Sequence, residues 1–528
     1  MSNSTSGGSA CNNFSRQVGA SPQFRNDQAS TCDGGRGAAG AAAHPPAQVD
    51  ARHKDGELRA ENGVQNGPIL GNYAKSSSTP QKSIWDADAK TRENYAMQFM
   101  ARQSMLEAFY SIPEDQRPKK PHRVCNCRRD LRPVEIGRDA KGKRQFSISK
   151  PEIYKHASTG NTFFGGLMIC GSPYACSVCA PKINEIDAAE IRHAVSEWVK
   201  QGGICLFVTL TFPHHRTDTF AEMMQQFTKG ALGRFRSGRV FAEIRKDLQY
   251  SGVIRSIEVT WGDANGFHPH SHEIWFVKPD FLYQHPVVDW SSFDKPSLSS
   301  MGKELKQFLL EPMKMRIFER WRSACVSSGL SAPSYERGVD VRIAETEAEL
   351  QARLAEYFTK TGIEKSGWGV DDEMTRHNTK KGKAGRFTPF DFLRHQFNPQ
   401  KTKTEKARYR RLFAEYVIGF KGVSKIYWSP GLKKHFDIKE ISEQAKAEQK
   451  TEQASLEYTV PPAIWVFVVA INDHRAELLL KVKNEGVQAA KDFLSSLLDR
   501  YAEYLDERYD ELPAVYQYIL ESITDEKT

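Results

Sequence analysis

Three histidines alternate along one stretch of this sequence, in a pattern that could bind a metal ion. His268, His270 and His272 are separated by single residues, and because side chains alternate between the two faces of a β-strand, all three project to one side. Glu258 lies on the preceding apolar run, where an antiparallel strand could bring its carboxylate opposite the histidines. Imidazole and carboxylate together suit a divalent cation with open coordination positions. The alternative is a hairpin that carries surface histidines without a metal.

The residues around this row predict a β-hairpin over 255–277. Apolar residues alternate along its first half, and the Gly- and Asn-containing segment 262–266 is typical of a turn. Pro269 cannot donate a hydrogen bond to a neighbouring strand, so we expect His268 to lie at the mouth of the hairpin and to be a poorer ligand. The predicted metal ligands are therefore His270, His272 and Glu258, with His268 as a further candidate.

A second group of potential metal ligands precedes the hairpin. Cys176 and Cys179 are separated by two residues, the spacing with which two thiolates reach one zinc ion. A tetrahedral site needs two more ligands, for which we expect Cys170 and either Cys127 or Cys125. Four thiolates leave no open coordination position, so the sequence predicts a structural Zn²⁺ site with no part in catalysis. Scattered buried cysteines are the alternative.

Three segments of the chain form an ordered set of motifs. They are LFVTLTFPH at Leu206–His214, HPHSH at His268–His272 and AEYFTKTG at Ala355–Gly362. In this order they resemble the motifs of rolling-circle replication initiators, the Rep proteins of the HUH endonuclease superfamily, and flanking segments resemble Rep proteins of Gram-negative plasmids. Ser271 departs from the family, which usually has a bulky apolar residue between the two histidines. The resemblance covers roughly residues 125–434.

The resemblance assigns a role to Tyr357 that periodicity does not. A helix predicted over 345–360 places Tyr357 on its apolar face, where a core aromatic is expected. The resemblance instead implies that Tyr357 is the nucleophile and that Lys360 assists it, with Mg²⁺ or Mn²⁺ at the histidines. The implied reaction is site- and strand-specific nicking of origin DNA through a 5′-phosphotyrosine intermediate, followed by rejoining. Arg353 stands where some members carry a second tyrosine or a glutamate, so no termination mechanism is implied.

Composition fits a soluble nucleic-acid-binding protein. The 528 residues carry a formal net charge of +9, and basic runs such as 380–386 suit a phosphate backbone. The N-terminus has no apolar core typical of a signal peptide, and no run of about 20 apolar residues predicts a membrane span. We therefore expect a cytoplasmic protein that does not engage a membrane. The predicted DNA-binding residues are Lys380, Lys381, Lys383 and Arg386.

The chain is expected to fold as an α+β protein in four parts. These are a disordered tail (1–85), a helical and Cys-rich zinc-binding segment (86–200), an endonuclease domain (201–435), and a linker with a small α/β region (436–528). The resemblance implies an HUH-type central antiparallel sheet flanked by helices. In the last part, the charged stretch 438–456 predicts a helical linker, and the apolar runs 464–471 and 476–480 predict a pair of strands.

Other functions remain compatible with these patterns. A relaxase or a single-strand transposase would use the same metal and tyrosine chemistry, whereas a zinc-containing DNA-binding repressor would need only the cysteines and basic runs. No Gly-rich phosphate loop followed by Lys-Ser or Lys-Thr occurs, so no built-in helicase motor is indicated. The expected partners are single-stranded or stem-loop origin DNA, a host helicase and a polymerase.

Overall fold

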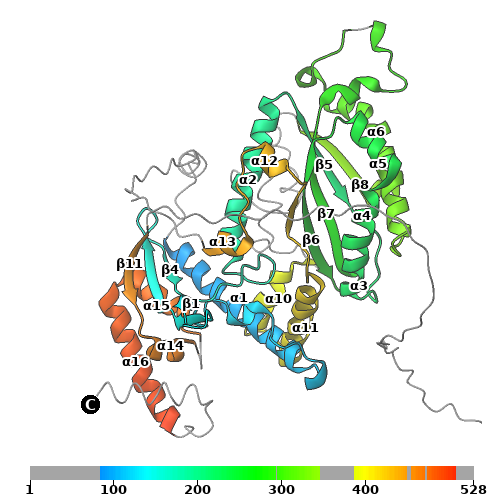
Figure 1. The fold of residues 1–528 in the computed structure, drawn as a ribbon. Helices are drawn as coiled ribbons and strands as arrows, with labels where there is room; N and C mark the ends of the chain where they lie inside the picture. Colours follow the sequence, from blue (N-terminus) through cyan, green and yellow to red (C-terminus); the bar gives the residue numbers. More distant parts are fainter. Residues whose placement is uncertain (1–83, 293, 345–385, 449–453, 470–472, 507–528) are drawn as a thin grey trace, which may run out of the picture. The chain divides into compact units, whose positions relative to one another are not determined.

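The computed structural model describes residues 84–292, 294–344, 386–448, 454–469 and 473–506, and an antiparallel sheet lies at its core (Figure 1). Neighbouring strands follow the order β10, β6, β7, β5, β8, and the short β9 also pairs with β6. Helices flank this sheet, which confirms the predicted α+β class. The strands are β5 (Ile204–Leu210), β6 (Gly252–Gly262), β7 (Gly266–Val277), β8 (Val339–Ala344), β9 (Arg386–Phe387) and β10 (Ile426–Trp428).

The predicted hairpin forms the centre of this sheet. Strands β6 and β7 are joined by a tight turn in which Gly266 has a φ of +78°, a conformation that favours glycine. His270 of β7 lies opposite Glu258 of β6, and His272 lies opposite Thr209 of β5. Because β7 has a partner strand on each edge, the histidine strand is held from both sides. The register places Glu258, His270 and His272 on one face, as predicted.

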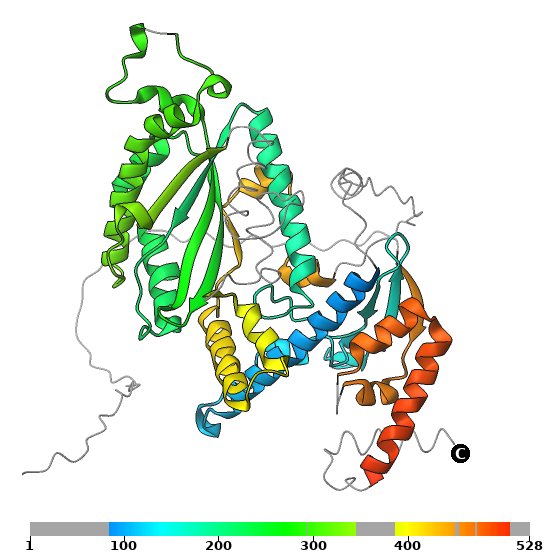
Figure 2. The same cartoon turned by 180° about the vertical axis from the view of Figure 1, so that it is seen from behind.

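Helices cover both faces of the sheet (Figures 1 and 2). Helices α2 (Ala180–Lys200) and α12 (Leu432–His435) pack on one face, where Trp198 meets Phe276 of β7 edge to face. His270 and His272 share the parity of Phe276 along β7, so they belong to this face. The other face packs on α3 (Phe220–Gln225), the π-helical η4 (Gln226–Ala231), α4 (Leu232–Phe235), α5 (Gly238–Asp247), α6 (Lys303–Val326) and α7 (Tyr335–Gly338).

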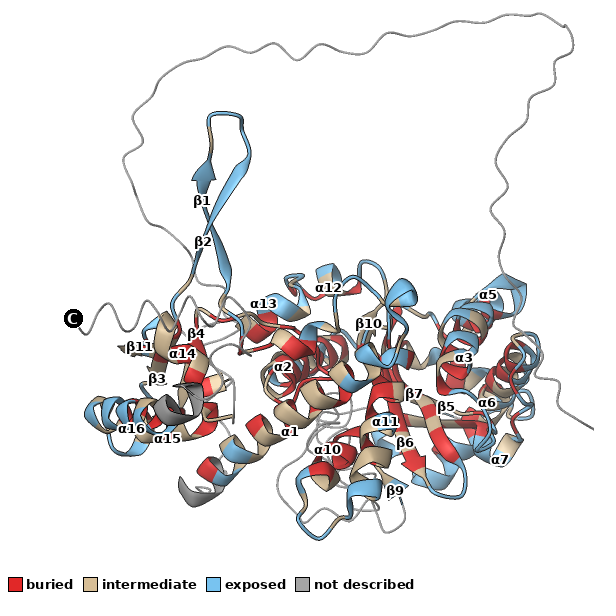
Figure 3. Cartoon of the chain, turned by 90° about the horizontal axis from the view of Figure 1, so that it is seen from below, coloured by how far each residue is buried: buried red, intermediate tan, exposed pale blue. Residues whose placement is uncertain are grey.

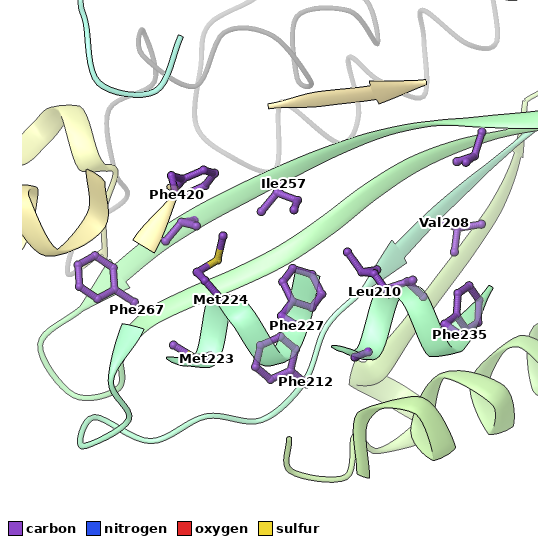
Figure 4. Packing of buried hydrophobic residues seen from close by; sticks show 14 of the residues in the cluster. Val208, Leu210, Phe212, Met223, Met224, Phe227, Phe235, Ile257, Phe267 and Phe420 are labelled. Carbon is purple, nitrogen blue, oxygen red and sulfur yellow. The ribbon is translucent and has the colours of Figure 1, made fainter. Parts of the chain in front are cut away.

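Aromatic and sulfur-containing side chains fill the core on this second face (Figure 4). Phe227 packs against Phe212 with ring centroids 5.1 Å apart, and Phe235 meets Trp275 of β7 at 6.1 Å. Trp275 and Phe235 are fully buried, and burial of side chains this large contributes the bulk of the stability of a sheet face. The connection from β7 to α6 contains the short 3-10 helices η5 (Pro279–Gln284), η6 (Trp290–Ser292) and η7 (Leu298–Ser300).

A buried ion pair lies within this aromatic core. Glu273 of β7 is 1% exposed and pairs with Arg236, which follows α4. Its carboxylate also accepts hydrogen bonds from the Ser271 hydroxyl at 2.8 Å and the Trp275 indole at 2.7 Å. Burial alone would raise the pKa of Glu273, but the Arg236 guanidinium, the positive charge of Arg255 and the Trp275 hydrogen bond hold that pKa below its usual value. Glu273 is therefore ionised in the folded protein.

Removal of Arg236 is expected to destabilise the fold strongly. Arg236→Ala leaves the Glu273 carboxylate buried without its cation, which costs about 3–5 kcal/mol of unfolding free energy. The pKa of Glu273 is lower in the folded chain than in the unfolded chain. The ion pair therefore contributes its full stability at pH values above the pKa of an unfolded-chain carboxyl group. This contribution is lost as the pH falls through the lowered pKa of Glu273 in the folded chain. The difference in unfolding free energy between parent and variant should therefore become smaller as the pH is lowered from neutral.

Urea unfolding of parent and Arg236→Ala at several pH values measures this effect. The control is the double variant Arg236→Met/Glu273→Met, which removes both charges and is expected to recover most of the loss. An Arg236→Ala protein as stable as the parent at neutral pH would show that the ion pair does not contribute as described.

The Cys-rich and C-terminal segments form a second, smaller sheet. Its strand order is β11-β3-β4, so residues 454–459 pair with a strand near the cysteines. The elements that precede the central sheet are α1 (Ile84–Tyr110), η2 (Glu114–Gln116), η3 (Arg123–Asn126), β1 (Pro133–Arg138), β2 (Arg144–Ile148), β3 (Glu152–His156) and β4 (Thr162–Gly165). Between β9 and β10 the chain forms α10 (Pro389–Phe397) and α11 (Lys403–Gly419). The elements after α12 are α13 (Glu443–Glu448), β11 (Ala454–Thr459), α14 (Pro462–Val469), α15 (Arg475–Asn484) and α16 (Val487–Asp506).

The structure corrects two predictions for the C-terminal segment. The apolar runs 464–471 and 476–480 were expected to be strands, but the described part of the first run, residues 464–469, lies in helix α14, and the second run lies in helix α15. Helix α14 begins at Pro462, a favourable first helical residue, and buries residues on several sides, so its apolar run lacks the period that distinguishes a helix from a strand. The linker 438–456 was expected to be helical, but it contains the short helix α13 and enters β11 at Ala454.

Several predictions fall on residues outside the described ranges. They include residues 1–83 of the N-terminal tail and the whole of the helix predicted over 345–360. The division of the chain into four parts remains a prediction. Among the helices in the described ranges, none combines the length and the apolar composition that a membrane span requires.

Candidate metal centres

Glu258, His270 and His272 converge on one point of the central sheet. The Nε2 atoms of His272 and His270 lie 3.1 and 3.3 Å from the same carboxylate oxygen, Oε2 of Glu258. The three side chains are between 10% and 13% exposed, so water has limited access to the group. Their ligand atoms all lie within 4.8 Å of one another. The group therefore has the size and donor set of a candidate divalent-metal site.

Hydrogen bonds on the far side of each ring orient the two imidazoles. His270 Nδ1 lies 3.3 Å from the backbone carbonyl oxygen of His268, and His272 Nδ1 lies 3.2 Å from the Thr209 hydroxyl. A carbonyl oxygen can only accept, so His270 Nδ1 donates in that contact, and Nε2 is the ring atom that would coordinate a metal ion. Such outer contacts fix ring orientation in metal sites. Thr209 of β5 is therefore a positioning residue for His272.

His268 lies outside this group and pairs with a different histidine. Its Nδ1 is 3.1 Å from Nδ1 of His214, and the two rings lie side by side with centroids 4.7 Å apart. Burial, together with the neighbouring His270 and His214, lowers the pKa of His268 to about 3. His268 is therefore neutral, with one ring nitrogen donating and the other accepting. The expectation that His268 is the poorer ligand agrees with this geometry.

Four cysteine sulfurs form the second candidate metal centre. Cys127, Cys170, Cys176 and Cys179 are at most 2% exposed, and their Sγ atoms lie within 4.8 Å of one another. The shortest separations are 3.4 Å for Cys127–Cys179 and 3.7 Å for both Cys170–Cys179 and Cys127–Cys176. Sulfurs at the corners of a tetrahedron with Zn–S bonds of about 2.3 Å are about 3.8 Å apart. The observed spacing fits such a centre.

The structure decides between the two cysteines that the sequence left open. Cys127 joins the group, whereas Cys125 Sγ lies 4.0 Å from the carbonyl oxygen of Arg102, where burial raises the pKa of the thiol to about 11. Amide groups donate toward the clustered sulfurs, from the Cys170 backbone to Cys127 at 3.4 Å and from the Gln98 side chain to Cys176 at 3.2 Å. Donors of this kind stabilise thiolates.

The C-terminal segment reinforces the cysteine centre. Arg475 of α15 is fully buried and donates to the backbone carbonyl oxygens of Cys127 at 3.2 Å and Arg128 at 2.9 Å. Asp473 neutralises its guanidinium with a 2.7 Å hydrogen bond to Nε. Trp465 of α14 donates to the Arg129 carbonyl oxygen at 2.6 Å. The loop that carries Cys127 is thus fixed by residues more than 300 positions away in the chain.

Removal of a clustered cysteine is expected to release metal and to lower stability. Cys176→Ser and Cys179→Ser each take one thiolate from a closed site, and the binding free energy of such a site is part of the folding free energy. Elemental analysis should show about one zinc ion per parent chain and less in each variant. Cys125→Ser and Cys205→Ser are matched controls, because both thiols are buried but lie outside the group. Full zinc content in Cys176→Ser/Cys179→Ser would contradict the assignment.

The predicted nucleophile and most predicted DNA contacts lie outside the described residues. These are Tyr357, Lys360, Lys380, Lys381 and Lys383. The described chain resumes at Arg386, which is exposed and pairs with Gly262 at the turn end of β6. Arg386 also contributes to the lowered pKa of His268, so its charge lies near the histidine row.

Two described tyrosines are poorly suited to act as the nucleophile. Tyr416 is 5% exposed and packs against Phe420 with ring centroids 4.8 Å apart, and burial raises its pKa. The Tyr335 hydroxyl donates to Glu311; burial and this carboxylate raise the pKa of Tyr335 as well. A raised pKa disfavours the tyrosinate that attacks phosphorus.

Comparison with known proteins supports the motif resemblance. The chain is 30% identical over 276 residues to a protein named "Protein rep" from Streptomyces lividans, which covers 46% of this chain and 56% of that protein. The chain is similar to a Rep protein. It is also 32% identical over 148 residues to a "Neomycin resistance protein" from Streptomyces cyanogenus, which covers 24% of this chain and 34% of the relative. No family model and no solved structure matches the chain.

The Rep match confirms the resemblance to Rep proteins that the motifs indicated. The chain spans about half the length of the first relative and about a third of the second. The similarity says nothing of the HUH superfamily or of a tyrosine nucleophile, so the reaction remains a prediction from the motif resemblance.

Proposed function

We propose that this protein initiates rolling-circle DNA replication by nicking one strand of its origin and later rejoining it. The observation that carries the proposal is the convergence of His270 and His272 on Glu258 at the centre of an antiparallel sheet. Similarity to a Rep protein supports replication as the process. The flanking segments, which resemble those of Rep proteins of Gram-negative plasmids, favour an initiator over a relaxase or a transposase.

Glu258, His270 and His272 would hold Mg²⁺ or Mn²⁺. A divalent ion bound there would supply positive charge to the scissile phosphate as negative charge develops on its oxygens. Thr209 and the His268 carbonyl keep both Nε2 atoms directed at the ion position. The limited exposure of the group reduces competition from water. A hard, oxygen-preferring ion is favoured because the reaction needs open positions for phosphate oxygens.

Tyr357 is the proposed nucleophile. Its phenolic oxygen attacks phosphorus, the bond from phosphorus to the 3′ oxygen breaks, and a proton passes to the leaving 3′ oxygen. The products are a free 3′-hydroxyl and a 5′-phosphotyrosine. Rejoining reverses these bonds when a 3′-hydroxyl attacks and the tyrosine leaves, so no external energy source is needed. Lys360 is proposed to stabilise the tyrosinate and the phosphate.

The remaining parts are assigned supporting roles. The cysteine centre is proposed to hold Zn²⁺ and to stabilise the fold without taking part in cleavage. Lys380, Lys381, Lys383 and Arg386 are proposed to contact the single-stranded or stem-loop origin DNA in a cytoplasmic setting. A host helicase and a polymerase would extend the nicked strand.

Metal-dependent nicking tests the proposed function. The protein is incubated with a supercoiled plasmid that carries its own replicon's origin, with Mg²⁺ or Mn²⁺ and then with chelator. Nicking is expected to require the metal and to return when Mg²⁺ is added back, while origin binding persists in chelator. Nicking that continues in chelator would contradict the metal role. Binding without nicking under every metal condition would favour a DNA-binding repressor.

A further inference from the structure

The hairpin formed by β1 and β2 is exposed along its whole length. Every residue of both strands is exposed, and both are coloured as exposed in Figure 3. At its base, the bridge between Leu131 and Leu167 and the hydrogen bond from Arg132 N to the Gly166 carbonyl oxygen at 3.3 Å join it to the rest of the chain. A two-stranded hairpin is marginally stable by itself in water. The stability of the fold therefore does not explain why the chain forms this exposed hairpin.

Large apolar side chains lie on this hairpin without protein cover. Phe146 is 57% exposed and Ile148 is 67% exposed, and Ile136 on the other strand is 63% exposed. Residues directly opposite in an antiparallel pair share a face. Since Arg144 lies opposite Arg138, and Phe146 lies opposite Glu135, one face presents Ile148, Phe146 and the two arginines in succession. Contiguous exposed apolar groups rimmed by charge are typical of a binding surface.

The charge of the hairpin indicates an anionic partner. Residues 132–148 contain five cationic and only two acidic side chains. Asp139 is used within the turn, where its Oδ1 accepts from the backbone amides of Lys141 and Lys143 at 2.9 Å each. Glu135 lies 3.5 Å from Arg144. The acidic groups are thus directed at the hairpin itself, and the tip presents an excess of positive charge.

We infer that this β1–β2 hairpin is a second DNA contact of the protein, which inserts into a groove of duplex DNA beside the cleavage site. A two-stranded β-ribbon fits the major groove, which is about 12 Å wide. The register shift between Glu135 and Gly137 is a bulge, which increases the right-handed twist of the ribbon. Arg138, Lys141, Lys143 and Arg144 would meet phosphates, and Phe146 would contact apolar groove atoms such as thymine methyl groups.

Duplex DNA fits these residues better than single-stranded DNA does. Proteins that bind single strands stack successive bases on several aromatic side chains, whereas the hairpin carries a single aromatic residue, Phe146. The inference rests on the proposed function for the nature of the nucleic acid. It adds a recognition element that leaves the Glu258–His270–His272 group free to act on a single strand.

Removal of four positive charges at the tip of the hairpin tests the inference. The variant Arg138→Gln/Lys141→Gln/Lys143→Gln/Arg144→Gln is compared with the full-length parent, with a short fluorescein-labelled DNA duplex as the probe and anisotropy as the readout. Duplex binding should weaken roughly ten- to hundredfold at low salt, and the slope of log K against log salt should become shallower by about two to four. Phe146→Ala should weaken duplex binding with no change in that slope.

Matched controls separate this effect from a general loss of charge. Arg239→Gln/Arg245→Gln/Lys246→Gln/Arg322→Gln removes four exposed cations from α5 and α6 and should bind duplex like the parent. Arg138→Lys/Arg144→Lys keeps the charges and should retain most of the affinity. Far-ultraviolet circular dichroism and bound zinc should match the parent in all variants.

Three outcomes would overturn the inference. The first is a duplex affinity of the tip variant within twofold of that of the parent. The second is an equal loss of duplex affinity in the control variant of α5 and α6. The third is a sedimentation coefficient that differs between parent and tip variant because the hairpin joins two copies of the chain, while both proteins bind duplex. Nicking of a short single-stranded origin oligonucleotide is measured in parallel and should be unaffected by the tip variant. A parent that binds duplex through the hairpin but nicks nothing would refute the proposed function and leave the hairpin assignment standing.

Discussion

Replacement of Tyr357 by phenylalanine is expected to abolish nicking and the covalent DNA adduct. The substitution removes one oxygen from an aromatic side chain and changes its volume little, so the fold and origin binding should persist. Without that oxygen there is no nucleophile to form the phosphotyrosine. The residual nicking rate should fall to that of DNA with no enzyme, measured on a supercoiled origin plasmid with Mg²⁺ or Mn²⁺.

Two described tyrosines supply the controls for this result. Tyr335→Phe and Tyr416→Phe should nick at near-parental rates, because burial or a carboxylate neighbour raises the pKa of each hydroxyl. An adduct that persists in Tyr357→Phe and disappears in Tyr335→Phe or Tyr416→Phe would move the nucleophile to that residue.

Removal of either converging histidine should have the second large effect. His270→Ala and His272→Ala each take one nitrogen from the Glu258 group, and the charge that a bound metal supplies is needed mainly in the transition state. Nicking rates are expected to fall roughly 10²–10³-fold at fixed metal concentration, the size of loss seen when one group that stabilises transition-state charge is removed. Origin binding should change little.

The metal dependence of related variants identifies the third ligand. Glu258→Gln should need more Mn²⁺ to reach half-maximal rate, because an amide oxygen is an uncharged and poorer ligand. His268→Ala should lose less activity than His270→Ala, since His268 directs its Nδ1 at His214 and does not belong to the Glu258 ligand group. An inactive His268→Ala together with an active His270→Ala would mean that the ligand register is wrong. A parental metal titration for Glu258→Gln would exclude Glu258 as a ligand.

The histidine group could be predicted from the sequence because its geometry depends on residues close together in the chain. A period of two places His270 and His272 on one face whatever the surroundings, and a short turn fixes which residues of the preceding strand can lie opposite. Glu258 could therefore be predicted as the carboxylate partner, and the register confirms that it lies opposite His270. His214 could not be predicted as the partner of His268, because that contact joins residues 54 positions apart through the sheet.

The cysteine centre shows where local pattern is insufficient. The spacing of Cys176 and Cys179 predicts a shared ion, but Cys125 and Cys127 are two residues apart and only the path of the chain selects between them. Cys127 is selected because long-range hydrogen bonds from Arg475 fix its loop. The pairing of β11 with β3 is equally non-local, and no local sequence pattern predicts it.

The β1–β2 hairpin shows a different limit of sequence analysis. Its basic residues stand close together in the sequence, but their solvent exposure and their alignment with Phe146 depend on the strand register, which composition does not determine. Helix α14 was misassigned for the opposite reason, since a short apolar run buried on several sides has the same pattern in a helix and in a strand.

The most direct test of the proposed chemistry is to locate the covalent bond between protein and DNA. The full-length protein is incubated with Mg²⁺ and a single-stranded origin oligonucleotide, digested with protease and nuclease, and analysed by mass spectrometry. The proposed mechanism predicts a peptide that contains Tyr357 with a nucleotide attached through its 5′-phosphate, and a free 3′-hydroxyl on the released strand. An adduct at another residue, or cleaved DNA that carries a free 5′-phosphate and no linked peptide at any time point, would contradict it.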